Sequence, residues 1–181
     1  MIETQRLILK PLSYSELSKQ IDSPAILAEE MGFTPSSSLM DSDVTEAIQH
    51  DLLPLLADAN NDSLFYTLWL IIEKNKKTII GGFCFHGKPD IEGEVKIGYG
   101  IDNTFRNHGY MTEAINGIIQ WVKRPYDDKE NQSRDGYNQS FFYPCFNEKS
   151  FYNYRPKRFV GHHEIFFKAI KISSQPLQRF V

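Results

Sequence analysis

Three β-type segments follow one another between residues 65 and 101, and no other feature of the sequence constrains the fold as strongly. They span residues 65–73, 78–85 and 94–101, and polar turns at residues 75–77 and 87–93 separate them. This order predicts a meander of neighbouring strands. The last segment alternates cleanly, so its two faces should differ. One face carries Val95, Ile97, Tyr99 and Ile101, and the other carries Glu94, Lys96, Gly98 and Gly100.

Helices are predicted on both sides of this meander in the chain. Residues 112–123 place apolar side chains at helical spacing, and the inward residues are Ala114, Ile115, Ile118, Ile119 and Val122. Residues 6–10 form a strand that Pro11 ends, and Ser13 caps a helix through residue 21 with Glu16 completing a capping box. Residues 23–38 hold a short helix, and Pro54 should kink or end a helix over residues 43–57. The predicted order is β-α-α-β-β-β-α, followed by a tail.

Composition narrows the class of protein. With 181 residues, 41% of them hydrophobic, the chain can bury the core of one domain over residues 1–181. A net charge of −3 argues against a nucleic-acid binder, and no apolar run approaches the roughly 20 residues of a membrane span. The polar start of the chain is unlike a signal peptide, so a cytoplasmic location is expected. Cys84 and Cys145 alone supply neither a disulfide framework nor a thiolate cage, and no metal site is predicted.

The stretch from residue 98 to 114, GYGIDNTFRNHGYMTEA, carries the chemistry. A strand ends, a polar turn follows and a helix begins, so unpaired amides and the positive end of the helix dipole suit an anion such as a pyrophosphate. Gly109 permits a positive φ, and Arg106 and His108 add donors at the rim. Gly98 and Gly100 indicate that a ligand approaches the strand backbone closely. The stretch is neither a Walker loop nor a dinucleotide fingerprint.

Residues 106–111, Arg-Asn-His-Gly-Tyr-Met, resemble motif A of the GCN5-related N-acetyltransferases, Gln/Arg-x-x-Gly-x-Gly/Ala. Met111 departs from the small residue usual at the last position. The opening residues 3–12, ETQRLILKPL, are similar to the branch that contains the ribosomal-protein N-terminal acetyltransferases. The resemblance covers residues 1–123 in the right order. It implies an α+β fold of the GNAT type, with a mixed, mostly antiparallel sheet flanked by helices.

This resemblance implies an acetyl-CoA-dependent N-acetyltransferase, with acetyl-CoA as co-substrate and no metal. The pyrophosphate would lie on the loop and helix start, and the pantetheine arm would run beside the strand end. The implied binding residues are Tyr99, Gly100, Ile101, Arg106, Asn107, His108, Gly109, Tyr110, Met111 and Thr112. A backbone N–H near the strand end would stabilise the oxyanion while an amine attacks directly. The amine acceptor would be a protein N-terminus or a small molecule.

Glu94 is the candidate general base because it shares a strand face with the two glycines. The family often places a glutamate two residues further on, where this chain has Lys96, so Glu94 and Lys96 could instead be solvated edge charges. His86 is a second candidate for moving the proton. Cys84, within an apolar strand, fits the core better than a nucleophile.

Residues 131–181 do not follow the family pattern. This tail is basic and rich in aromatic residues, and we do not expect it to supply the strand that the family places beside residues 94–101. In frame, Asn147, Ser150 and Tyr154 match part of a family pattern in which Tyr154 would protonate the departing thiolate. If the tail fails to complete the cleft, the chain is a catalytically impaired relic of the fold, or a homodimer restores the missing surface. An unrelated anion- or nucleotide-binding module is the third alternative.

A frameshift between residues 123 and 131 would explain the tail. A frame displaced by one base over residues 131–151 permits a sequence close to the family pattern I-x-A-x-T-x-x-x-N-x-x-S at the family spacing. The nucleotide sequence of the gene tests this prediction. Codons compatible with the displaced reading are expected, and incompatible codons would leave Tyr154 as the candidate general acid.

Overall fold

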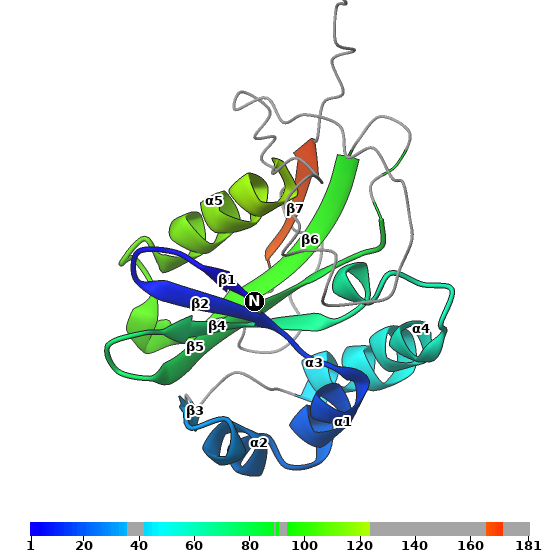
Figure 1. The fold of residues 1–181 in the computed structure, drawn as a ribbon, viewed down its shortest axis with the longest axis horizontal. Helices are drawn as coiled ribbons and strands as arrows, with labels where there is room; N and C mark the ends of the chain where they lie inside the picture. Colours follow the sequence, from blue (N-terminus) through cyan, green and yellow to red (C-terminus); the bar gives the residue numbers. More distant parts are fainter. Residues whose placement is uncertain (36–41, 89, 91–93, 124–165, 172–181) are drawn as a thin grey trace, which may run out of the picture.

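A seven-stranded mixed sheet forms the centre of the computed structural model (Figure 1). The structure describes residues 1–35, 42–88, 90, 94–123 and 166–171. The strands lie in the order β1-β2-β4-β5-β6-β7, and β3 pairs with β5. Their bounds are β1 Ile2–Glu3, β2 Leu7–Pro11, β3 Thr34–Pro35, β4 Leu68–Glu73, β5 Thr78–Phe85, β6 Glu94–Ile101 and β7 Phe166–Lys171. Among the strands that the structure describes, only the short β3 runs parallel to its neighbour, which confirms the predicted mixed, mostly antiparallel sheet of an α+β fold.

The meander β4–β5–β6 has the predicted order and antiparallel pairing. The prediction for its first strand began too early, because residues 63–65 form a 3-10 turn and β4 begins at Leu68. Asp62 caps that turn with its side chain accepting from the Leu64 N–H, a local bond that competes with strand pairing. The N-terminal strand β2 then pairs with the free edge of β4, with Leu7 opposite Glu73.

The helices before the meander follow the sequence signals. Helix α1, Tyr14–Asp22, begins at a complete capping box between Ser13 and Glu16, and α2 spans Pro24–Glu30. Helix α3, Ser42–Ala47, continues through a π-helical turn, Ile48–Leu52, into α4, Leu53–Ala57. The wide turn directly precedes Pro54, whose missing N–H breaks the regular ladder, and the Leu53 N–H bonds to the Ile48 carbonyl. The irregularity therefore lies over residues 48–52, before the predicted position, and the helical run continues through Pro54 to Ala57.

Two apolar cores lie on the two faces of the sheet. Helix α5, Tyr110–Lys123, covers one face, and the helices α1 to α4 cover the other (Figure 1). Of the five predicted inward residues, Ala114, Ile115, Ile118 and Ile119 are buried, and the side chain of Val122 lies outside the described ones. The alternation of β6 is also confirmed, since Val95 and Ile97 belong to the α5 core. This arrangement makes β6 a wall between two different environments.

Strand β7 corrects the expectation that the tail contributes nothing beside β6. Phe166–Lys171 pairs antiparallel with β6, from Glu94 opposite Lys171 to Tyr99 opposite Phe166. The segment FFKAIK is rich in aromatic and β-branched residues, and the edge of β6 offers it unpaired amides and carbonyls. The predicted gap beside β6 is therefore closed from residue 94 to residue 99.

The contact between β5 and β6 generates a test of this packing. A Cβ atom at Gly81 would lie 2.5 Å from the Gly100 carbonyl oxygen, whereas a Cβ at Gly100 would meet nothing within 4 Å among the described residues. We expect Gly81→Ala to lower the free energy of unfolding by about 2 kcal/mol, because backbone atoms must move apart. Gly100→Ala is the matched control and should leave the free energy of unfolding nearly unchanged. Equal denaturant midpoints for the two variants would contradict this packing.

Candidate active site

The loop between β6 and α5 has the geometry of an anion cradle. Asp102, buried after the end of β6, accepts hydrogen bonds from the Thr104 N–H at 2.8 Å and its hydroxyl at 2.6 Å. These bonds turn the chain sharply away from the sheet. Asn107 and Gly109 then adopt positive φ values of 63° and 77°. Left-handed residues in a loop before a helix are typical of anion-binding nests, in which successive amides face one side.

The first turn of α5 adds further donors to this cradle. The Glu113 N–H bonds to the Gly109 carbonyl at 3.0 Å, so the amides of Tyr110, Met111 and Thr112 precede the hydrogen-bonded ladder of the helix. A cavity of about 470 Å³ lies against them. Its described lining consists of Tyr99, Ile101, Phe105, Arg106, Asn107, Gly109, Tyr110, Met111 and Thr112. The predicted binding loop therefore lines one continuous cavity with the end of β6.

Arg6 and Glu113 hold this loop to the N-terminal strands. Glu113 Oε1 accepts from the Arg6 N–H and from the Thr4 hydroxyl, both at 2.7 Å, and its Oε2 accepts from Arg6 Nε at 2.6 Å. Arg6 also donates through Nη1 to the His108 carbonyl at 3.1 Å, and its guanidinium lies 4.5 Å from the centre of the Tyr110 ring. One arginine thus fixes the loop and the helix start simultaneously.

The electrostatics around Glu113 favour its charged form. Burial raises its pKa, but the hydrogen bonds from Thr4 and Arg6 and the charge of Arg6 outweigh this, so the pKa lies below its ordinary value. The carboxylate is therefore ionised at neutral pH. Its charge is neutralised by Arg6, which leaves the helix amides to attract an external anion.

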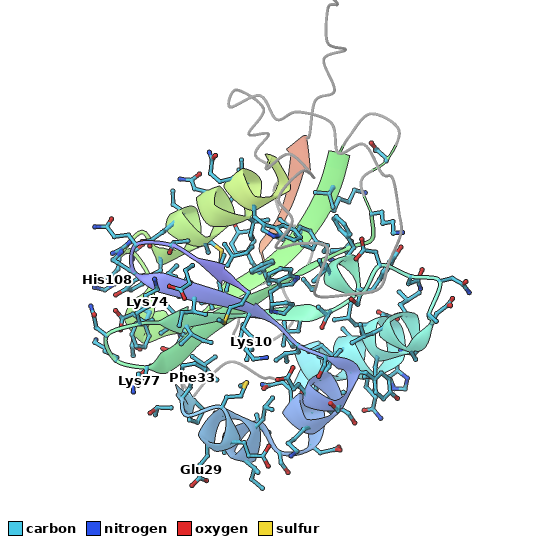
Figure 2. The ribbon with its side chains drawn as sticks, in the orientation of Figure 1. Lys10, Glu29, Phe33, Lys74, Lys77 and His108 are labelled. Atoms are coloured by element: carbon cyan, nitrogen blue, oxygen red, sulfur yellow. The ribbon has the colours of Figure 1, made fainter. Side chains whose placement is uncertain are left out.

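Lysines of the β4–β5 turn lie close to the same loop. Lys76 Nζ is 5.2 Å from the centre of the Phe105 ring, and Phe105 lines the cavity. Figure 2 shows His108 and Lys74 at the same end of the molecule, where the Lys74 N–H bonds to the Arg6 carbonyl. Lys74 is already paired with Glu3 at 2.9 Å, so Lys76 is the better placed of the two to add positive potential near a bound anion.

A second cavity, of about 580 Å³, lies on the opposite face of the sheet. Its floor is the glycine face of β6, at Gly98 and Gly100, and its walls come from α1 and from the helical run of α3 to α4. Tyr99 contributes to both cavities. The predicted close approach to a bare strand is thus matched by open space over Gly100, and β6 separates the cavity at the loop from a largely apolar cavity.

Three titratable side chains that line the second cavity, His86, Cys84 and Tyr99, are shifted toward their neutral forms. Burial, followed by the charge of Lys96, lowers the pKa of His86, while Asp51 partly opposes that shift. Burial raises the pKa of Cys84 to about 11, so its thiol stays protonated at neutral pH and is a poor nucleophile. Burial also raises the pKa of Tyr99. A neutral imidazole on this wall can accept a proton.

The structure brings together most of the predicted binding residues, but not all of them. His108 is exposed and does not line the cavity, and its Nδ1 lies 2.7 Å from the Arg106 carbonyl. Gly100 lies on the floor of the second cavity instead of the first. The backbone of Glu94 pairs with Lys171 at the far end of β6, and Tyr154 lies outside the described residues. Sequence reasoning missed Phe105 and the Arg6–Glu113 contact, whose partners are 107 residues apart.

Within the described ranges, no group of three His, Cys, Asp or Glu side chains is placed to hold a metal ion. Among the same residues, no helix is long and apolar enough to cross a membrane.

Comparisons with known proteins agree on one family. The family model described as an acetyltransferase (GNAT) domain matches residues 6–137. The uncharacterized N-acetyltransferase YjdG of Bacillus subtilis (strain 168) is 34% identical over 125 residues, covering 67% of this chain and 71% of that protein.

Two solved structures were also matched, each covering 94% of this chain and 97% of the other. A GNAT-family acetyltransferase from Bacillus anthracis gives a TM-score of 0.42 at 14% identity. A Salmonella typhimurium acetyltransferase that modifies the N-terminal serine of 50S ribosomal subunit protein L7/L12 gives a TM-score of 0.45 at 15% identity.

The low pKa of Glu113 yields a test of the clamp formed with Arg6. A depressed pKa stabilises the fold above the ordinary carboxyl pKa, and that stabilisation disappears as the pH falls through the folded-state value. We expect Glu113→Gln to cost about 2 kcal/mol of unfolding free energy at pH 7, because charge-assisted hydrogen bonds are lost. The difference from the wild type should shrink below pH 4.

The control for this experiment is Glu30→Gln. Glu30 pairs with Lys19 at 2.7 Å, but its side chain is 52% exposed. A surface pair of this kind contributes less than about 1 kcal/mol. A difference for Glu113→Gln that stays constant from pH 7 to pH 3, or that equals the Glu30→Gln difference, would contradict the role of the Arg6–Glu113 contact.

Proposed function

Because the chain belongs to the GNAT acetyltransferase family, we propose that it transfers an acetyl group from acetyl-CoA to a primary amine. The observation that carries the proposal is the cavity along the Arg106 to Thr112 loop, where helix amides and a left-handed Gly109 face the same space. Such amides suit the pyrophosphate of a nucleotide-type cofactor. The second cavity, across β6, leaves room for the amine.

The loop residues fit the shape of a CoA-type ligand. The amides of residues 107–112 would donate hydrogen bonds to the pyrophosphate oxygens, while Tyr99 and Ile101 line the route toward the strand end. The backbone of Gly100 and Ile101 lies beyond the last residue of β6 that pairs with β7, so an extended pantetheine arm could hydrogen bond there. When bound, acetyl-CoA supplies a thioester, an acyl group activated toward amines.

The transfer requires a neutral amine at the strand end. Its nitrogen forms a bond to the acetyl carbon, the carbon–sulfur bond breaks, the amine loses one proton and the thiolate gains one. Backbone N–H groups near Gly100 would stabilise the oxygen that becomes negative. Glu94 and Tyr154 remain the proposed base and acid, and His86 is the alternative base because it lines the second cavity in neutral form. Positioning of the two substrates would supply most of the rate gain.

A catalytically impaired relic of the fold is the second candidate, and the paired edge of β6 is the observation that favours it. Strand β7 occupies the side of β6 on which the pantetheine arm was expected to lie, up to Tyr99. A chain of this kind would keep its loop but lose turnover. Release of free thiol from acetyl-CoA in the presence of amines distinguishes an enzyme from a relic.

Gly109 provides the sharpest test of the loop. Its φ of 77° is unfavourable for any residue with a Cβ, and an added Cβ would meet Arg6 Nη2 at an ordinary 3.7 Å. We therefore expect Gly109→Ala to weaken acetyl-CoA binding about tenfold, since left-handed strain of roughly 1–2 kcal/mol disfavours the binding conformation. Isothermal titration of acetyl-CoA into the full chain measures this, with one-site micromolar binding expected for the wild type.

Gly32→Ala is the matched control. Gly32 has nearly the same φ, 76°, with nothing within 4 Å of its added Cβ among the described residues, and it lies outside the cavity lining. This variant should carry similar backbone strain and bind acetyl-CoA like the wild type. Equal binding by the Gly109 and Gly32 variants would argue against the loop as the binding element, and no heat from folded wild-type protein would contradict the proposed function.

A further inference from the structure

The second cavity carries information about the acceptor that family membership does not supply. We propose that the acceptor is a small primary monoamine with a compact aliphatic or aromatic body, seated between the helical run α3–α4 and the sheet. The reaction in this inference depends on the proposed acetyl transfer. The choice of amine depends on the described residues that line the cavity.

The walls of the cavity are apolar on several sides. Ile48, Leu52 and Leu55 come from the π turn and α4, and Leu68 and Leu70 come from β4. A volume of about 580 Å³ falls in the range that encloses small organic ligands. Burial of a phenyl or branched alkyl group against such walls is favourable in proportion to the apolar area removed from water.

Charge excludes a polycation from this cavity. Among the described lining residues, Asp51 is the one acidic side chain, and no lysine or arginine is present. A polyamine or an aminoglycoside would bring several positive charges into apolar surroundings with one carboxylate to neutralise them, which is costly. One carboxylate matches one ammonium group.

Gln20 offers a second polar contact at the wall of the cavity. It comes from α1, it is 4% exposed, and its Oε1 accepts no hydrogen bond from the described residues. An unsatisfied buried oxygen of this kind is destabilising until a donor reaches it. An N–H of the amine, reached by rotation of the flexible carboxamide, would satisfy it.

The apolar surroundings also favour the reactive form of the amine. Removing an ammonium from water disfavours its charge, which opposes the stabilisation of that charge by Asp51 and eases the loss of the proton. Gly98 and Gly100 on the floor leave space for the nitrogen to approach the backbone of β6. The apolar lining of the cavity thus selects an apolar monoamine and also favours loss of the proton from its nitrogen.

The first experiment compares three acceptors on the full chain with acetyl-CoA, by release of free thiol and by mass of the product. The probes are 2-phenylethylamine, spermidine and a hexapeptide beginning with serine. We expect 2-phenylethylamine to give at least about tenfold higher kcat/KM than either of the others. Equal or faster acetylation of spermidine or the peptide would overturn the proposal.

Direct binding separates this inference from the proposed function. Titration of 2-phenylethylamine into the full chain, in the presence of CoA, should show saturable binding that spermidine does not share. Binding of the amine without any thiol release would contradict the proposed acetyl transfer while supporting the assignment of the cavity. Thiol release without such binding would contradict the assignment of the cavity alone.

A pair of matched variants places the ligand in the cavity. Leu55 lines it and is 43% exposed, whereas Ile26 on α2 is 52% exposed and does not line it. Leu55→Asn should weaken 2-phenylethylamine binding about tenfold, because an uncharged polar group replaces apolar contact. Ile26→Asn should have no effect, and both variants should bind acetyl-CoA like the wild type. Equal amine binding by the two variants would overturn the proposal.

Discussion

The ion pair between Arg6 and Glu113 is the interaction on which the candidate site depends. It joins the beginning of the sheet to the first turn of α5, and the same guanidinium holds the His108 carbonyl and lies over Tyr110. A loop with two left-handed residues would otherwise sample many conformations, at an entropic cost to any ligand that must select one. The clamp removes that freedom in advance, so the helix amides are already aligned. The ion pair also neutralises the Glu113 carboxylate, which would otherwise repel an anion at the start of α5.

The second organising element is β6, because one strand presents different chemistry on each face. Its larger residues pack under α5 and lead to the loop that lines the first cavity, while its glycines leave the opposite face open beneath α3–α4. Tyr99 borders both cavities. Two ligands of unlike polarity can therefore approach the same strand end without sharing a pocket. On the proposed function, that separation lets a polar cofactor and an apolar amine reach the same strand end from opposite faces.

Local signals predicted the parts of the site that neighbouring residues determine. The alternation of residues 94–101, the capping box of Ser13 and Glu16, and the positive φ of Gly109 are each decided within a few residues, and each is present. The Arg6–Glu113 contact could not be found in this way, since it depends on how α5 packs against β2. The apolar cavity also depends on tertiary packing, because the π turn before Pro54 aims Ile48 and Leu52 at the sheet. Sequence patterns assign faces to elements, but packing decides which faces meet.

Strand β7 limits where an acyl group can be placed. It pairs with β6 through Tyr99 and leaves Gly100 and Ile101 as the described residues beyond its reach. On the proposed function, an extended arm could add to the edge of β6 only over these two residues, next to the loop that holds its anionic end. The acyl carbon would then lie near Tyr99 and Gly100, where the two cavities approach each other. The strand that pairs with residues 94–99 would thus act as a stop, placing the thioester opposite the open floor of the second cavity.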